Sequence, residues 1–550
     1  MNWQREAVVY QIYPRSFKDS NGDGIGDIRG IIEKLDYLKD LGVDVLWICP
    51  MYQSPNDDNG YDVSDYENIM TEFGVMKDFD ALLKEVHARD MKLLMDLVIN
   101  HTSDEHPWFI ESKSSTSNSK RDWYIWKEGK ENIEPNNWES IFGGSAWQYD
   151  ETTKAYYLHL FSKKMPDLNW ENRELREALY AMINGWLEKG IDGFRIDAIS
   201  HIKKEDFEDI INPQGLKYVP SFSKHMNKSG ILTFLQELKE NTFDKYDILT
   251  VGEANGVKSE EGPLWVNKQD GKFTMVFQFE HLHLWGEEED KQAKLYVLKK
   301  AMSKWQAALH QKGWNALYIE NHDLTRAVSS LGNDKLYLVE SAKALGLMYF
   351  MQQGTPFIYQ GQELGMTNKD FKSIQDYRDI ATLNRYLEEL EKGKNQQQAL
   401  LKVSKTSRDH SRTPMQWNAD SHAGFTTGLP WIEVNKNYKT LNVAHEELDK
   451  NSVLHFYKKM IQLRKQHKTL IGGEYTWLLQ EDRQIYAYTR KDTDHEYLII
   501  CNLSEEQATF NLPYTLTEKE LLLTSYSKDD SENKNDSKLR PYEARLYKTR

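Results

Sequence analysis

The stretch Gly193-Phe194-Arg195-Ile196-Asp197-Ala198-Ile199 decides how the rest of the chain is interpreted. Small and apolar residues surround one Arg and one Asp, a pattern that predicts a buried strand of a parallel sheet. Arg195 and Asp197 are two residues apart, so their side chains point to the same face of that strand. An Arg beside a carboxylate keeps the carboxylate ionised and oriented, as a nucleophile requires. On this stretch alone, a structural ion pair at the end of the strand explains the pattern equally well.

Composition limits the classes of protein to which the chain can belong. A net charge of −15 argues against binding to nucleic acid or to an anionic membrane surface. Sixteen Trp and thirty Tyr suit carbohydrate binding, although aromatic rings also fill ordinary cores. Cys49 and Cys501 lie far apart in apolar runs, which predicts buried thiols in a reducing compartment. Neither a signal-type start nor an apolar run of about 20 residues is present, so we expect a cytoplasmic protein without a membrane span.

Strand-like and helix-like segments alternate along most of the chain. Apolar runs near Val8, Val45, Leu93, Gly193, Ile248, Thr274, Ala316 and Pro356 give eight strands, and eight strands with intervening helices predict an α/β fold, the (β/α)8 TIM barrel. A span rich in Trp, Ser and Asn, 102–172, is expected to be an inserted subdomain after strand 3. Residues 473–550 alternate in polarity, which predicts a C-terminal antiparallel β domain, a β-sandwich. The barrel is therefore expected to comprise 1–101 and 173–472.

Carboxylates follow three of the predicted strands. Asp197, Glu253 and Asp323 are expected to meet at the carboxyl end of the barrel, where such barrels carry their chemistry. Cleavage of an acetal at a sugar requires a nucleophile or base and a proton donor beside the anomeric carbon. Glu253 follows Val251 and Gly252 on an apolar strand, so desolvation should raise its pKa and suit it as the acid. Three purely structural carboxylates at barrel strand ends are the less favoured explanation.

The loop Asp19-Ser20-Asn21-Gly22-Asp23-Gly24-Ile25-Gly26-Asp27 has oxygen-bearing side chains at regular spacing. This spacing, with glycines that allow tight curvature, matches the first half of a calcium-binding loop. The distal bidentate Glu of an EF-hand is missing, so the loop is not an EF-hand. A plain Asn/Gly turn is the alternative. An amphipathic helix from Ile31 to Leu41 is expected to follow the loop.

Five ordered motifs and one further segment carry a family resemblance. They are Asp96-Leu97-Val98-Ile99-Asn100-His101, Met165-Pro166-Asp167-Leu168-Asn169, Gly193-Phe194-Arg195-Ile196-Asp197, Val251-Gly252-Glu253, Glu320-Asn321-His322-Asp323 and Arg412-Thr413-Pro414-Met415-Gln416-Trp417. With these motifs the chain resembles the α-amylase-like glycoside hydrolases, in particular the bacterial oligo-1,6-glucosidase and α-glucosidase branch, over almost its whole length.

The resemblance implies a role for each matching residue. Asp197 would be the nucleophile, Glu253 the general acid/base and Asp323 the stabiliser of the transition state. The residues that would line or hold the terminal sugar are Asp58, Tyr61, His101, Phe142, Phe161, Arg195, Phe279, His322 and Arg408. Core packing explains the three Phe equally well, and Arg412 is an alternative to Arg408. The resemblance also implies a structural calcium ion, and no organic cofactor, with ligands from Asp19, Asn21, Asp23, the Ile25 carbonyl and Asp27.

Two departures from the family pattern concern the linkage that is cleaved. Ala198 follows the nucleophile, where oligo-1,6-glucosidases usually have Val, and Ala254-Asn255-Gly256 replaces a bulkier segment after the acid. Smaller groups there resemble members that act on α-1,4 links.

We therefore expect a retaining, exo-acting α-glucosidase that acts on small α-glucosides such as maltose, isomaltose and malto-oligosaccharides, with α-1,4 links favoured. The alternatives are an oligo-1,6-glucosidase, a trehalose-6-phosphate hydrolase, for which Lys258 would be the phosphate-binding candidate, and a sucrose isomerase. A monomer or weak homo-oligomer is expected.

Overall fold

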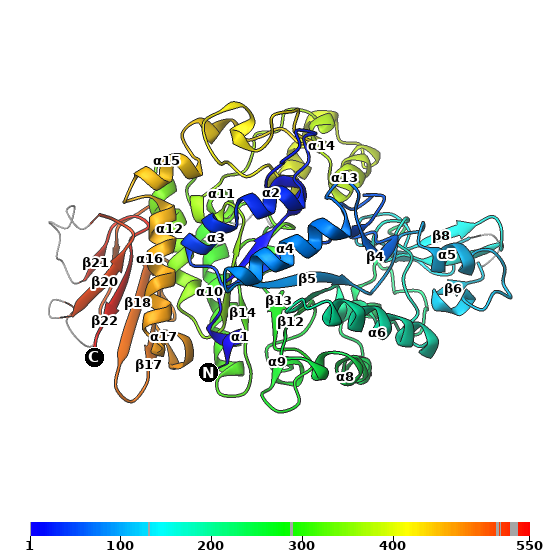
Figure 1. The fold of residues 1–550 in the computed structure, drawn as a ribbon, viewed down its shortest axis with the longest axis horizontal. Coiled ribbons are helices and arrows are strands. Elements are labelled where there is room, and N and C mark those ends of the chain that lie inside the picture. The colour runs from blue at the N-terminus through cyan, green and yellow to red at the C-terminus, as the bar shows by residue number, and fades with distance from the viewer. Residues whose placement is uncertain (1, 130–132, 286–289, 513–515, 517–518, 528–536) are drawn as a thin grey trace.

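A computed structural model of the chain describes residues 2–129, 133–285, 290–512, 516, 519–527 and 537–550 (Figure 1). Its centre is a sheet of parallel strands: β1 Val9–Ile12, β2 Val45–Ile48, β5 Lys92–Val98, β10 Gly193–Asp197, β12 Leu249–Ala254, β13 Met275–Gln278, β14 Ala316–Leu317 and β15 Thr355–Tyr359. The strand order is β13-β12-β10-β5-β2-β1-β15-β14, and a parallel bridge between Val276 and Asn315 joins the two edges. The sheet therefore closes into the predicted eight-stranded barrel.

Helices cover the outside of the barrel and leave its strands buried on both faces. Every residue of β10 and of β2 is buried, which explains why β2 is entirely apolar and why the two charged residues of β10 need partners. The helices are α1 Trp3–Glu6, α2 Ile28–Glu33, α3 Leu35–Leu41, α4 Met76–Ala88, α5 Pro107–Ser112, α6 Arg173–Glu188, α7 Phe222–His225, α8 Ile231–Asn241, α9 Gly262–Val266, α10 Lys291–Leu309, α11 Ala327–Ser330, α12 Leu338–Phe350, α13 Ile380–Glu391, α14 Gln396–Ser404, α15 Val443–Leu448, α16 Val453–Gln466 and α17 Thr469–Gly472.

The prediction of one helix from Ile31 to Leu41 is wrong. The helical segment begins three residues earlier, at Ile28, because the Asp27 carboxylate accepts the Gly30 N–H at 2.7 Å and caps α2. It then breaks at Lys34, whose φ of −107° and ψ of 5° lie outside the helical region, and α3 continues from Leu35. Two short helices therefore replace one longer one.

A small antiparallel sheet is inserted between β5 and α6 and projects from the barrel at the right of Figure 1. Its strands are β6 Trp126–Lys127, β8 Trp147–Asp150 and β9 Ala155–Leu158, in the order β6-β9-β8. A further strand of the insertion, β7 Trp138–Glu139, pairs with β11 Val219–Pro220. Strand β11 follows β10 along the chain but is not part of the barrel sheet. Trp138, Trp147 and Leu158 belong to a separate apolar core of this region. The remaining pair is β3 Tyr52–Gln53 with β4 Asp65–Ile69.

The C-terminal part forms an antiparallel β domain that packs on the barrel. Its main sheet has the order β16-β17-β18-β22-β20, with β16 Glu474–Leu478, β17 Ile485–Lys491, β18 Glu496–Asn502, β20 Glu520–Thr524 and β22 Ala544–Lys548. One face of the sheet, which includes Tyr486, Tyr488 and Ile499, belongs to the same apolar core as the barrel. Alternate residues on the other face pack with β19 Ala508–Thr509 and β21 Lys538–Leu539. Both faces of the sheet are therefore covered, and β17 and β18 are buried along almost their whole length.

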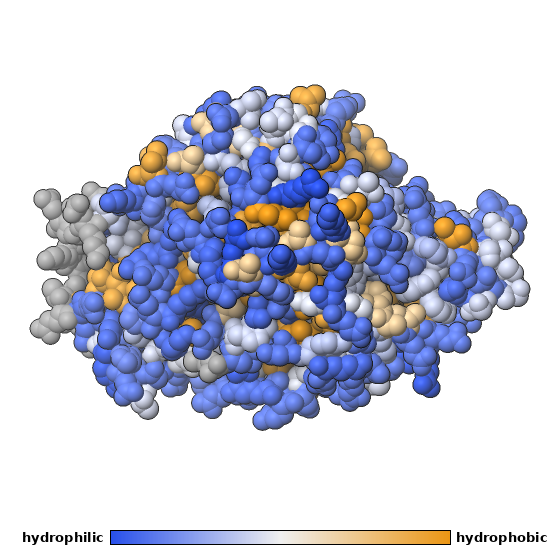
Figure 2. Space-filling model, viewed as in Figure 1, coloured by the Kyte–Doolittle hydropathy of each residue, from blue (hydrophilic) through white to orange (hydrophobic). Residues whose placement is uncertain are grey.

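Hydrophilic residues dominate the molecular face in Figure 2, and apolar residues are visible between them in patches. In the part of the chain that the structure describes, no helix is both long enough and apolar enough to cross a membrane.

Candidate active site

A pocket of about 220 Å³ lies at the carboxyl ends of the barrel strands. Asp197, Glu253 and Asp323, which come from separate strands or strand ends, all line it. All of the predicted sugar-site residues line the pocket except Arg195 and His322, which lie directly behind it. The lining also contains residues that were not predicted as sugar-site residues: Ile141, Met165, His201, Asn255, Leu282 and Asn321.

Arg195 lies beneath the pocket and connects three carboxylates. Its Nη1 donates to Oδ1 of Asp96 and to Oδ1 of Asp197, each at 2.7 Å, and its Nη2 donates to Oε1 of Glu253. The Ala198 N–H donates to the other oxygen of Glu253 at 2.9 Å. Asp197 and Glu253 are therefore held side by side on one guanidinium group. Asp96 was not predicted as a site residue, although it stands in a motif strand.

The Asp197–Glu253 pair retains a proton near neutral pH. Burial raises the pKa of Glu253 to about 7, against the charge of Arg195 and with added repulsion from Asp197. Burial likewise raises the pKa of Asp197, and Arg195 opposes the rise. Three buried carboxylates share a single cation here, so the group as a whole cannot ionise fully without a large electrostatic cost.

Asp323 lies in the opposite electrostatic situation. Its Oδ1 accepts hydrogen bonds from Arg408 at 3.3 Å and Arg412 at 3.0 Å, and its Oδ2 is 3.1 Å from Nε2 of His322. Burial alone would raise the pKa of Asp323, but His322 and the two guanidinium groups outweigh burial and hold the pKa below its ordinary value. Asp323 therefore stays ionised while the neighbouring pair keeps a proton.

Arg408 closes one end of the pocket. Its Nη2 donates to Asp58 at 2.8 Å and to Asp379 at 2.6 Å, and its guanidinium lies 4.8 Å from the centre of the Phe142 ring. Arg412 is completely buried and does not line the pocket, so Arg408 is the one of the two that faces the pocket. Asp379, at the start of α13, was missed because no motif surrounds it and only the fold brings it to Arg408.

His322 does not line the pocket but contacts Tyr61, which does. The two rings stack at 5.3 Å, and Nε2 of His322 lies 2.7 Å from the Tyr61 hydroxyl. The Gln11 side chain donates to Nδ1 of His322 at 2.8 Å, so the proton of the neutral ring is on Nε2. Burial lowers the pKa of His322 to about 3, which keeps the ring neutral. The ring therefore positions Tyr61 and Asp323.

His101 presents a free donor to the pocket. Lys204 Nζ donates to Oδ1 of Asn100 at 2.9 Å, which fixes the orientation of that amide, and the amide nitrogen then lies 3.1 Å from Nδ1 of His101. His101 consequently carries its proton on Nε2, a buried atom with no hydrogen-bond partner among the described residues. Lys204 is itself ion-paired with Asp167 at 2.8 Å. Neither residue was predicted to support the site.

The Asp19–Asp27 loop is folded around its first carboxylate. Asp19 accepts the N–H groups of Asn21 at 2.9 Å, Gly22 at 2.7 Å and Gly24 at 2.8 Å. The carboxylate oxygens keep further lone pairs, so these bonds do not prevent coordination of an ion. Over the described ranges, however, no group of three or more His, Cys, Asp or Glu side chains is arranged to hold a metal ion. The calcium ion therefore stays a prediction.

The chain is similar to known proteins over nearly its whole length. The family described as alpha amylase, catalytic domain, matches residues 11–473, and the alpha-amylase SusG C-terminal domain matches residues 485–545. The chain is 57% identical over 549 residues to a probable oligo-1,6-glucosidase of Bacillus subtilis, with 99% of both chains covered. It is 54% identical to the oligo-1,6-glucosidase of Parageobacillus thermoglucosidasius, with 100% of this chain and 99% of that one covered.

A solved structure is similar over the same extent. The trehalose-6-phosphate hydrolase of Bacillus licheniformis superposes with a TM-score of 0.92 at 43% identity, with 99% of each chain covered. Fold, site geometry and matches over nearly the full length lead to one conclusion: the chain belongs to the α-amylase family and is a glycoside hydrolase.

Proposed function

We propose that this member of the family is a retaining, exo-acting α-glucosidase that releases terminal α-1,6-linked glucose from short oligosaccharides such as isomaltose. The observation that carries the proposal is the closed end of a small pocket, where Arg408 and Asp58 meet directly beside the three carboxylates. A closed end admits the terminus of a sugar chain and stops the chain from passing through. The names of the two oligo-1,6-glucosidases reported above support the α-1,6 linkage.

The acid and the nucleophile are assigned from the family motifs, because burial raises the pKa of both Glu253 and Asp197 to about 7. Glu253, protonated below about pH 7, donates its proton to the glycosidic oxygen as the bond to the anomeric carbon breaks. Asp197 attacks that carbon from the other side and forms a covalent glycosyl-enzyme. Glu253, now ionised, takes a proton from water, which attacks the same carbon and releases glucose with retained configuration.

The remaining pocket residues stabilise and orient the sugar. Ionised Asp323 faces the positive charge that develops at the anomeric carbon. The Nε2–H of His101 and the Arg408–Asp58 pair offer donors and an acceptor to the sugar hydroxyls. Asp197 and Glu253 both accept hydrogen bonds from the Arg195 guanidinium, so the nucleophile and the acid lie close together. A retaining mechanism requires such a short separation.

A preference for α-1,4 links is the second candidate, and Ala198 favours it. This residue lines the pocket directly after the nucleophile and presents only a methyl group. A small group there leaves more room on the leaving-group side than Val would. The two candidates share the reaction and differ in the angle at which the second sugar leaves the pocket.

A substrate panel with resolved products separates these possibilities. We expect isomaltose to be hydrolysed with the highest kcat/KM among isomaltose, maltose, sucrose, trehalose and trehalose-6-phosphate. A higher value for maltose would favour the second candidate, and hydrolysis of trehalose-6-phosphate alone would overturn both. Asp197→Asn should lower kcat on every accepted substrate by several orders of magnitude while the protein stays folded. A variant that kept more than a few per cent of kcat would contradict the assignment of the nucleophile.

A further inference from the structure

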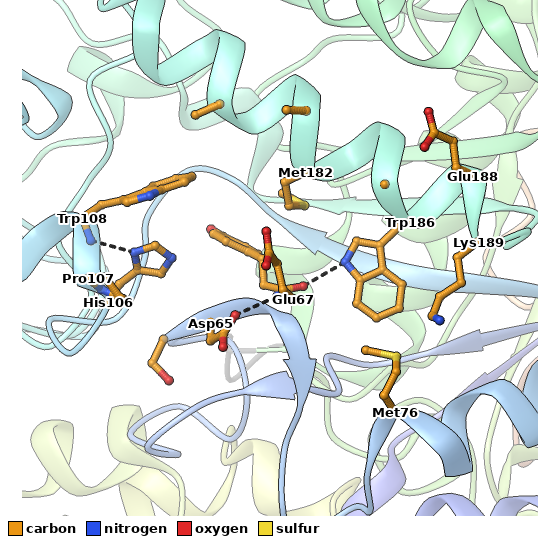
Figure 3. Close-up of a pocket in the computed structure, with 15 residues that line it drawn as sticks. Asp65, Glu67, Met76, His106, Pro107, Trp108, Met182, Trp186, Glu188 and Lys189 are labelled. Atoms are coloured by element: carbon orange, nitrogen blue, oxygen red, sulfur yellow. Dashed lines mark hydrogen bonds between the residues drawn. The ribbon is translucent and has the colours of Figure 1, made fainter.

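A second, larger cleft lies on the outer side of the barrel, between β4, α5 and α6 (Figure 3). Its volume is about 920 Å³, within the range of about 300–1,000 Å³ that small-molecule sites span. It shares no lining residue with the catalytic pocket. The reaction described above therefore leaves this cleft without a role.

The cleft has an open apolar floor and one aromatic wall. Helix α6 contributes the small residues Ala181 and Gly185 to the lining, and a Cβ added at Gly185 would meet no atom within 4 Å. Trp108 forms the facing wall and is only partly buried. Its ring is held in place by Trp123 at 5.0 Å and by His106 at 4.5 Å. The wall is thus a pre-positioned aromatic surface, which loses little entropy on binding.

His106 is a largely buried residue whose ring lines the cleft. Its side chain is 4% exposed, and its Nδ1 accepts the Trp108 N–H at 3.1 Å, as the dashed line in Figure 3 marks. The second ring nitrogen, Nε2, points into the cleft in Figure 3. Burial lowers the pKa of His106 to about 4, so the neutral ring carries its proton on Nε2. The cleft therefore contains one donor aimed at a ligand acceptor.

The charges around the cleft select against anions. Exposed carboxylates of Glu67 and Glu188 lie among its lining residues. Lys189, which also lines it, is paired with Asp80 at 2.7 Å and is not free to neutralise a bound anion. A cation would meet the three carboxylates of Asp65, Glu67 and Glu188 but would leave the His106 donor unmatched. A neutral ligand that has hydroxyl groups and an apolar face can accept from His106, donate to the carboxylates and pack on Trp108.

We propose that this cleft is a second carbohydrate site, which binds a neutral gluco-oligosaccharide away from the catalytic pocket. The apolar face of one sugar ring packs on Trp108, a ring oxygen or hydroxyl accepts the His106 Nε2–H, and other hydroxyls donate to Glu67 and Glu188. The choice of a glucose oligomer among neutral sugars rests on the proposed function. The need for a polyhydroxylated ligand rests on the cleft alone.

The test measures binding while the catalytic pocket is filled. A saturating iminosugar inhibitor occupies the catalytic pocket, and isomaltotriose or maltotriose is titrated into the blocked enzyme by calorimetry. We expect one remaining binding event, weakened at least tenfold by Trp108→Ala. Gly185→Leu should weaken it to a similar extent, because a Cβ at this position meets no atom within 4 Å and the rest of the new side chain extends into the cleft. This second variant keeps the test valid if Trp108→Ala folds poorly.

Ile110→Ala is the matched control. Ile110 lies on α5 like Trp108, is 49% exposed and does not line the cleft, so its removal should leave the titration unchanged. No binding of either sugar to the blocked wild type, or unchanged binding by Gly185→Leu, would overturn the proposal. The proposal would also be overturned if the wild type were a dimer and Gly185→Leu converted it to a monomer, because the cleft would then be a subunit interface. Hydrolysis of isomaltose by the wild type is scored separately, so either conclusion can fail while the other stands.

Discussion

Within the pocket, Glu253 and Asp323 have different neighbours and therefore different protonation states. Glu253 shares its only cation, Arg195, with Asp96 and Asp197. Asp323, in contrast, receives hydrogen bonds from two guanidinium groups. Two carboxylates in one pocket can thus serve as proton donor and as permanent anion because their local charge balances differ.

The pKa of Glu253 predicts the alkaline limb of the pH–rate profile. The acid must be protonated for the first step, so kcat/KM should fall as the pH rises above about 7. Glu253→Gln should remove this limb and lower kcat strongly on oligosaccharides. An aryl α-glucoside with a very acidic phenol serves as the control, since its leaving group needs little protonation. An alkaline limb that began only above pH 9 would contradict the assignment.

Ala198 is the residue at which linkage preference can be tested. It lies in the left-handed region with φ at 44°, where a β-branched residue is strained. Ala198→Val should shift the ratio of kcat/KM for maltose and isomaltose towards isomaltose, by roughly 10- to 200-fold if the added methyl groups exclude the α-1,4 geometry.

Ala198→Gly separates the effect of bulk from that of the backbone. Gly adopts the same φ without strain and adds no atoms to the pocket. Ala198→Gly should therefore leave the maltose-to-isomaltose ratio of kcat/KM near the wild-type value. If Ala198→Val does not change this ratio either, Ala198 does not determine the linkage preference.

At the scale of single elements, the loop before α2 combines two structural tasks. Asp27 caps the helix through the Gly30 N–H, and Asp19 organises the loop backbone. Removal of either residue would therefore weaken the fold whether or not an ion binds. Asp23 is the better probe of calcium, because its carboxylate is exposed and accepts only the Ile25 N–H within this loop.

If calcium binds this loop, it should stabilise the native protein by mass action without entering the reaction. Excess chelator should then lower the Tm, and elemental analysis should find about one calcium ion per chain. Asp23→Asn should abolish both the ion and the chelator effect. An identical melting curve with and without chelator, together with no metal by elemental analysis, would refute the predicted site.

At the scale of the whole molecule, a buried arginine connects the C-terminal domain to the barrel. Arg490 of β17 donates to the carbonyl oxygens of Met351 at 3.1 Å and Ile471 at 3.1 Å, which both belong to the barrel part of the chain. Burial lowers the pKa of Arg490 to about 10, so its guanidinium remains charged at neutral pH. Together with the shared apolar core, these bonds join the barrel and the C-terminal domain.

Calorimetric melting should therefore show one transition for the barrel and the C-terminal domain. Arg490→Met should lower the Tm of that single transition, because each buried carbonyl left without a donor costs about 1–3 kcal/mol. Arg483→Met on the same strand hairpin is the control, since Arg483 is exposed. Two resolved transitions in the wild type would contradict the shared core as the source of cooperativity.

The sequence predicted the barrel because its signals are local. Eight apolar runs with helices between them are visible along the chain, and buried parallel strands cannot tolerate many polar residues. The break at Lys34 was missed because both halves of that segment keep helical periodicity. The shortness of β14, which spans only Ala316–Leu317, was also not visible in the apolar run that contains it.

The sequence by itself therefore determined the fold class, the family and the three carboxylates that meet at the barrel mouth, since each of these follows from strand order and from motifs at strand ends. Only the tertiary structure decided how those residues are charged and oriented. Asp379 reaches Arg408 across 29 residues, and Lys204 reaches Asn100 across 104, so no local pattern links them. Protonation depends on burial and on distances between charges, and these quantities exist only once the chain has folded.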